Sequence, residues 1–172
     1  MTTRPARICL TLLALAALAG CGPKFVRERV YDKPNMRVEL RHLKSGDAPV
    51  ARGYSHPATI ADVRIAHILA SLSYEDDEGN RKPAIRAQFV YELGDAISAA
   101  LAKAGPDDEV AAAVFPEDRR LQIFTDTRVT AFRLFVQGEQ MRVDFYAVEQ
   151  ALDPDARRAG TREYEIPTAL PT

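Results

Sequence analysis

Two alternating segments on either side of Gly138-Glu139 restrict the fold of this chain more than any other feature. The segments are 129–137 and 140–149, and a glycine at the first central position of a two-residue loop favours a β-hairpin. Because a shift of one residue would move every side chain to the other face, the pattern predicts a single register. One face is then apolar and the other pairs opposite charges. The expected cross-strand partners are Val136 with Met141, Leu134 with Val143, Phe132 with Phe145, Arg133 with Asp144, and Phe135 with Arg142.

A long amphipathic helix is predicted over 83–104. Apolar side chains recur there every four residues, which places them on one stripe of a helix. Pro83 suits the first helical position, and Gly105-Pro106 follows where the helix should end. The repeating apolar residues are Ile85, Phe89, Leu93, Ile97 and Leu101.

A second helix is expected over 60–72, because Thr59 and Asp62 have the spacing of a capping box. Its β-branched content leaves a strand over 65–74 as the alternative. Strands are also expected at 36–42, where apolar and charged residues alternate, and at 110–115 and 121–125, which flank a turn at 116–120.

The expected fold class is α+β, a mainly antiparallel sheet with one or two helices packed on one face. We expect a single globular domain over 36–150. Residues 21–35 are interpreted as a tether. In the alternatives, Phe25, Val26, Val30 and Tyr31 form a first edge strand or settle against lipid headgroups. Residues 151–172 are polar and proline-containing, and we expect a loosely held tail in which only 164–166 has strand character.

The N-terminus has the parts of an export signal. The cations Arg4 and Arg7 precede an apolar run at 8–18, and small residues lead to Cys21. A transmembrane helix needs about 20 apolar residues, and Pro23 and Lys24 close this run too early. This stretch is therefore expected to be an export signal.

The tetrapeptide Leu18-Ala19-Gly20-Cys21 resembles the lipobox of bacterial lipoproteins, a resemblance that covers the first 22 or so residues. It implies that the Cys21 thiol is acylated and that residues 1–20 are a signal peptide whose cleavage leaves Cys21 as the new N-terminus, held in a membrane by its lipid. In such lipoproteins an Asp after the cysteine commonly retains the protein at the inner membrane. This chain has Gly22, so the resemblance favours the outer membrane, facing the periplasm, over the inner membrane.

Charge and cysteine content exclude several classes of function. Without the two arginines of residues 1–20, 21 cations face 24 anions, a net charge of −3, so nucleic acid is not an expected partner. Of the two cysteines, Cys9 lies in the signal and Cys21 is expected to carry lipid. The mature domain then has no disulfide, thiol nucleophile or cysteine metal ligand.

The sequence contains no recognised arrangement of catalytic residues. His42, His56 and His67 have no partner at a metal-ligand spacing, and the acidic clusters fall in expected turns. Serine-nucleophile and phosphate-binding motifs are missing. We therefore expect no enzyme activity, no catalytic residues, no metal and no cofactor.

The outer face of the hairpin is the candidate interaction surface, because aromatic residues and arginine are enriched at protein interfaces. The alternative is that a strand, a helix or the C-terminal tail covers it as ordinary core. The expected function is a structural or protein-interaction module with a partner in the cell envelope, and the alternative is a binding module for a small apolar ligand or lipid between helix and sheet. The candidate residues are Val129, Arg133, Phe135, Arg142, Asp144 and Tyr146.

Overall fold

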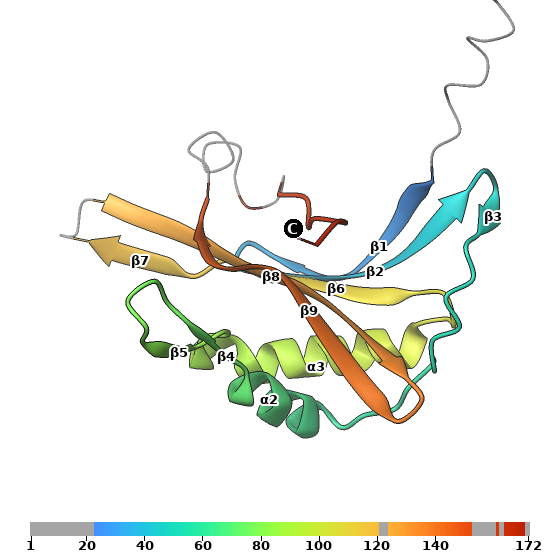
Figure 1. The fold of residues 1–172 in the computed structure, drawn as a ribbon, viewed down its shortest axis with the longest axis horizontal. Coiled ribbons are helices and arrows are strands. Elements are labelled where there is room, and N and C mark those ends of the chain that lie inside the picture. Colours follow the sequence, from blue (N-terminus) through green and yellow to red (C-terminus); the bar gives the residue numbers. More distant parts are fainter. Residues whose placement is uncertain (1–22, 121–123, 153–160, 162–163, 171–172) are drawn as a thin grey trace, which may run out of the picture.

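The computed structural model describes residues 23–120, 124–152, 161 and 164–170 (Figure 1). The expected signal peptide and Cys21 lie outside these residues. The elements are β1 (Lys24–Lys33), β2 (Met36–Ser45), β3 (Ala48–Pro49), α2 (Asp62–Ser71), β4 (Ser73–Glu75), β5 (Arg81–Pro83), α3 (Ala87–Lys103), β6 (Glu109–Val114), β7 (Glu117–Arg120), β8 (Phe124–Gln137) and β9 (Gln140–Ala151).

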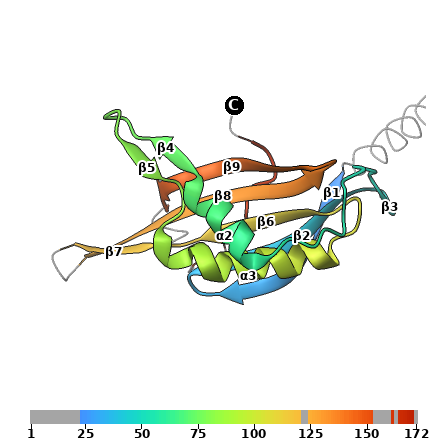
Figure 2. The same ribbon diagram turned by 90° about the horizontal axis from the view of Figure 1, so that it is seen from below.

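The main sheet is antiparallel throughout and runs in the order β1-β2-β6-β8. β8 is long enough to pair with β9 along one part and with β7 along another, and β3 pairs with the end of β2. β4 and β5 form a separate small hairpin. α2 and α3 both lie against the same face of the main sheet (Figures 1 and 2). The predicted α+β class, with helices on one face, is confirmed.

The β8–β9 hairpin has the predicted register. All five expected cross-strand pairs are present, and Gly138 in the turn has a φ of 61°, which glycine adopts without strain. The register shifts on either side of Ala131, so that Ala131 faces Ala147 and not Tyr146. The second shift places Val129 opposite Gln150 and not Val148, so the expected register holds from Phe132 to Gln137 only.

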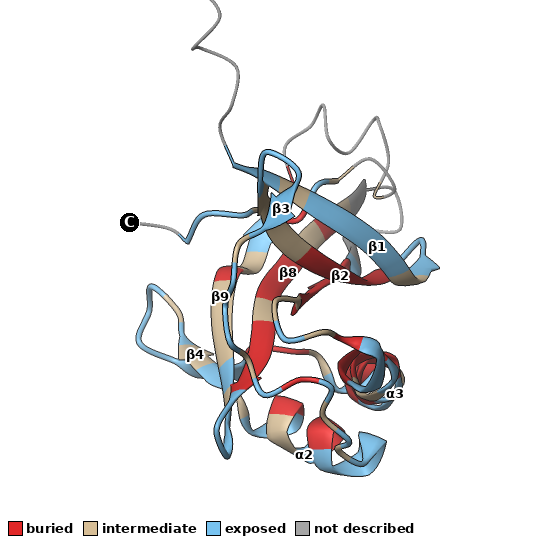
Figure 3. Cartoon of the chain, turned by 90° about the vertical axis from the view of Figure 1, so that its right-hand side faces the viewer, coloured by how far each residue is buried: buried red, intermediate tan, exposed pale blue. Residues whose placement is uncertain are grey.

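The main core lies between the helices and the sheet (Figure 3). The predicted α3 stripe is buried, with Leu93, Ile97 and Leu101 fully excluded from solvent. The sheet meets this stripe with alternate residues of each strand, as a period of two requires. These residues are Met36, Val38 and Leu40 of β2, Val110, Ala112 and Val114 of β6, and Phe132, Leu134 and Val136 of β8.

The helix boundaries differ from the sequence expectation. α3 begins at Ala87 and not at Pro83, because residues 81–83 are used by β5, and the backbone N–H of Ala84 donates to the Leu72 carbonyl. α2 begins at Asp62 without a side-chain cap, so the predicted capping box is wrong. The alternative strand over 65–74 is wrong, because residues 65–71 belong to α2 and β4 begins only at Ser73.

The two ends of the described chain are more ordered than expected. The segment interpreted as a tether contains β1, a ten-residue strand, so the edge-strand alternative is correct. The expectation of a loosely held tail is wrong for Ile166. Its side chain is 1% exposed and packs against the face of the sheet opposite the helices. The expected turn at 116–120 contains β7, and positions 121–123 of the expected next strand lie outside the described residues. Within the described ranges, no helix is long and apolar enough to cross a bilayer.

Gly94 allows α2 and α3 to approach closely. A Cβ atom built there would lie 2.8 Å from the Asp62 carbonyl oxygen and 3.1 Å from the Ala66 Cβ. Gly94→Ala should therefore push the helices apart at a cost of about 1–3 kcal/mol, against a gain of roughly 1 kcal/mol in helix propensity. We expect a net loss of unfolding free energy in urea denaturation. The exposed Asp95→Ala, on the same helix, should not show it; an equal effect in both variants would contradict the close packing.

Candidate functional site

The face of the sheet opposite the helices carries buried charge. We call it the polar face and define it by Arg37, Glu39 and Arg41 of β2, Glu109 of β6, Arg133 of β8, and Asp144 and Tyr146 of β9. Arg41 has no exposed surface and Glu109 is 2% exposed. Charged residues are almost never fully buried unless they are paired. The polar face is therefore the most unusual surface in the described part of the chain.

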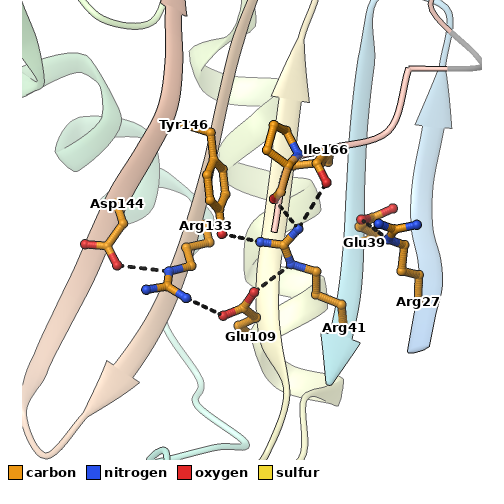
Figure 4. Close-up of polar contacts among 9 residues, drawn as sticks. Arg27, Glu39, Arg41, Glu109, Arg133, Asp144, Tyr146 and Ile166 are labelled. Carbon is orange, nitrogen blue, oxygen red and sulfur yellow. Dashed lines mark hydrogen bonds and ion pairs between the residues drawn. The ribbon is translucent and has the colours of Figure 1, made fainter. Parts of the chain in front are cut away.

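Its charged groups form a chain across four strands (Figure 4). Arg41 Nε donates to Glu109 Oε1 at 2.6 Å, and Arg133 Nη1 donates to Glu109 Oε2 at 3.2 Å. Arg133 Nε donates to Asp144 Oδ2 at 3.0 Å. The Arg41 guanidinium also donates to the Tyr146 hydroxyl. Two arginines and two carboxylates alternate along this row of side chains, so their four charges sum to zero.

The arginines of β2 also hold the C-terminal segment, residues 164–170, through its backbone. Arg41 Nη1 donates to the carbonyl oxygens of Pro167 at 2.7 Å and Ile166 at 3.3 Å. Arg37 Nη1 donates to the Tyr164 carbonyl at 2.6 Å. Carbonyl oxygens are present in every peptide. These donors can therefore hold a segment of irregular backbone without requiring particular side chains.

Small side chains of the sheet make room for this segment. Ala111 and Ala113 of β6 and Ala131 of β8 are fully buried in a second hydrophobic cluster that also contains Ile166. The Tyr164 ring packs edge-on against Phe115, with ring centroids 5.4 Å apart. On this side of the sheet, arginines that donate to main-chain carbonyl oxygens thus lie beside small apolar side chains that pack with Ile166.

A cleft of about 430 Å³ lies beside the segment, and one carboxylate in it is poorly satisfied. Glu39 is 4% exposed, and its Oε1 atom has no hydrogen bond and lies 3.7 Å from Arg27 Nε. Loss of solvent raises the pKa of Glu39, and the nearby arginines, Arg27 first, oppose that rise. The lining residues are Arg27, Arg29, Arg37, Glu39, Tyr164, Glu165 and Ile166.

The raised pKa predicts a pH-dependent effect of Glu39→Gln. A carboxyl whose pKa is higher in the folded state favours folding below its unfolded pKa, and this contribution is lost as the pH rises through the folded pKa. The stability of Glu39→Gln relative to wild type should therefore increase from pH 4 to pH 8, measured by urea denaturation at each pH. The exposed Glu28→Gln is the matched control on β1. A difference that shrinks as pH rises would contradict the raised pKa.

Three of the six predicted interaction residues are buried, whereas the hypothesis of an interaction surface required them to be exposed. Val129, Phe135 and Tyr146 are buried, at 2%, 8% and 7% exposure. Arg133 and Asp144 belong to the charged chain, and Arg142 is exposed. The C-terminal segment packs with Val129 and Tyr146 in the second hydrophobic cluster. This agrees with the alternative that the C-terminal tail covers the outer face of the hairpin. Phe135 instead stacks on Tyr54, with centroids 4.4 Å apart.

His56 and His42 both contact Asp108. His56 Nδ1 lies 2.9 Å from the Asp108 carbonyl oxygen, and Nε2 accepts from the Val136 N–H at 3.0 Å, so the ring is a neutral bridge. Burial lowers the pKa of His56, as that role requires. His42 Nδ1 lies 3.0 Å from Asp108 Oδ1, but both side chains are partly exposed. The described residues contain no cluster of His, Cys, Asp and Glu able to hold a metal ion.

Sequence reasoning missed Arg37, Glu39, Arg41 and Glu109. The first three alternate with apolar residues in β2, which is also the pattern of a strand with one solvent-exposed face. Glu109 ends the run Asp107-Asp108-Glu109, which resembles a solvated turn. The available indication was the strand character of 164–166, which could have suggested a covering segment.

Neither the family models, nor the curated proteins, nor the solved structures contain a match to this chain.

Proposed function

We propose that this protein is a lipid-anchored lipoprotein of the cell envelope, held by Cys21 in the outer membrane, facing the periplasm, and acting as a structural or protein-interaction module. The observation that carries the anchor is the sequence Leu18-Ala19-Gly20-Cys21 behind a charged and apolar leader. An anchor confines the domain to one surface and raises its effective concentration for partners on that surface.

The polar face supports an interaction role. Its arginines hold a segment of irregular backbone through main-chain carbonyl oxygens, and neighbouring alanines of β6 and β8 pack with the Ile166 side chain in one cluster. A peptide segment of a partner protein offers the same groups. We propose that such a peptide is what the module binds, in exchange for its own C-terminal segment.

The anchor is tested by Cys21→Ser. A serine hydroxyl at this position is not expected to be acylated, so incorporation of radioactive palmitate should be lost and the precursor should keep its signal peptide. Cys9→Ser is the matched control, because it lies in the expected signal and should leave labelling intact. Palmitate incorporation that persists in Cys21→Ser would contradict the proposed anchor.

The peptide exchange is tested by photocrosslinking in native envelopes. A benzoylphenylalanine at Phe115, which contacts Tyr164 and is uncovered when the segment is displaced, should give adducts with another envelope protein when the partner is present. The same residue at Asp77, in the exposed β4–β5 turn, is the control. Intermolecular adducts that are equally frequent at both positions would contradict a role for the polar face.

The second candidate function is binding of a small apolar ligand. A cleft of about 460 Å³ separates α2 and the residues before it from the β8–β9 hairpin, which is within the volume range of ligand sites. Ile68→Trp should fill it and reduce binding of a fluorescent fatty acid, while Val63→Trp on the exposed side of α2 should not. The lining includes Ile60, Ile68, Val136 and Met141.

A further inference from the structure

The start of β1 fixes how far the folded domain can stand from an acylated Cys21. Lys24 is the first residue of β1 and pairs with Lys44 of β2. Three residue steps separate Cys21 from Lys24, and a fully extended chain spans at most ~3.6 Å per step, about 11 Å in total. The headgroup layer of one leaflet is itself roughly 5–8 Å thick. The sheet therefore begins at the membrane surface, without a spacer.

The part of the molecule at that point is the corner formed by the first residues of β1, the last residues of β2, and β3. We call it the β1–β3 corner and define it by Lys24, Lys44, Ala48 and Pro49. β7 and the β4–β5 hairpin lie at the opposite end of the molecule (Figures 1 and 2). Attachment at Cys21 thus brings one end of the molecule to the bilayer.

The charge of the corner fits a surface of phosphate groups. Lys24 and Lys44 are directly opposite each other, and like charges in that position repel. A second like-charged pair, Arg27 with Arg41, is compensated by Glu39, Glu165 and Glu109. Over the described residues, neither lysine has a carboxylate within ion-pair distance, the nearby Asp47 included. The repulsion between the lysines is therefore left for an external anion to relieve.

The apolar side chains of β1 do not point to deep insertion. Val30 and Tyr31 pack against the main core, and the Phe25 ring lies 5.3 Å from the Arg41 guanidinium carbon. Only Val26, at 39% exposure, is counted among the exposed large hydrophobic residues of β1. Contact through lysine and phosphate, at headgroup depth, is what these positions allow.

We propose that the β1–β3 corner docks on the anionic phospholipid headgroups of the membrane that holds Cys21, with Lys24 and Lys44 contacting phosphate. The molecule then stands with β7 and the β4–β5 hairpin directed away from the bilayer. The inference rests on the proposed lipid anchor. It adds a fixed orientation, which a flexible tether would not impose.

The test uses the full, lipidated protein reconstituted into vesicles of anionic phospholipid with a headgroup-attached spin-label quencher. Single cysteines for a fluorophore are introduced as Ala48→Cys in the corner and Asp77→Cys in the β4–β5 turn, both at exposed positions. Quenching should be several-fold stronger at position 48 than at position 77. Equal quenching at the two positions would overturn the inference.

The role of the lysines is tested by adding Lys24→Gln and Lys44→Gln to the Ala48→Cys protein. Each basic residue near such a surface contributes about fivefold in binding, so the docking equilibrium should fall roughly 25-fold for the pair. Arg81→Gln with Lys82→Gln removes as many cations from β5 and should leave quenching unchanged. Equal losses from the two double variants would overturn the assignment to this corner.

The mass of each preparation separates the two proposals. Protein that carries acyl chains at Cys21 but shows equal quenching at both labels contradicts docking and leaves the anchor standing. Protein from the native membrane that carries no acyl chain contradicts the anchor and the docking together.

Discussion

Replacing Glu109 with glutamine is expected to lower the free energy of unfolding by about 3–5 kcal/mol, the usual cost of breaking a buried ion pair. Glu109 accepts from both Arg41 and Arg133, and Arg41 is fully buried. Glutamine keeps the size of the side chain but leaves Arg41 without a carboxylate partner. In a chain of this length such a loss corresponds to a decrease in Tm of roughly 6–20 °C, measurable by circular dichroism.

A double variant separates charge from packing. Arg41→Met with Glu109→Leu removes both members of the pair, and replacing a whole buried pair by apolar side chains is often neutral. We expect it to recover a large part of the stability lost in Glu109→Gln. The exposed Glu28→Gln should stay within about 0.5 kcal/mol of wild type. A Glu109→Gln protein as stable as Glu28→Gln would contradict the charged chain of the polar face.

Truncation of Ile166 is expected to have the second large effect. Its side chain is 1% exposed in the second cluster, and buried Ile→Ala substitutions cost about 2–5 kcal/mol. Leu170→Ala, four residues later and 42% exposed, should cost no more than about 0.5 kcal/mol. Urea denaturation of the two variants gives the comparison. Equal stability would mean that the C-terminal segment does not hold the polar face.

The β8–β9 hairpin and α3 could be predicted because their information is local. The register follows from the five cross-strand pairs around Gly138, and the α3 stripe follows from a repeat of four residues. The ends of α3 were harder to place. Pro83 is compatible with a helix start and with the end of β5, and only the pairing with Ser73 decides between them.

The polar face could not be predicted because its contacts are distant in the sequence. Arg41 meets Glu109 and the carbonyl oxygens of residues 166 and 167, more than 60 and 120 positions away. The alternation of apolar and charged residues in β2 indicates only that its two faces differ in polarity. Whether the charged face meets water or a covering segment depends on where residues 164–170 lie, which no local pattern specifies.

β1 illustrates the same limit at the other end of the chain. Its mixed, charged residues are typical of a spacer, and its strand structure depends on pairing with β2. The difference matters for the proposed docking, because a spacer would let a lipid-anchored domain move freely above the membrane and a strand that begins at Lys24 would not.

The central claim is that Cys21 carries lipid and forms the N-terminus of the mature protein. Intact-mass and N-terminal fragment spectrometry of the protein isolated from its own membranes tests it most directly. The account predicts loss of residues 1–20 and a mass increase on Cys21 equal to a diacylglyceryl group with or without a further acyl chain. A protein that retains Met1 and an unmodified Cys21 would contradict it.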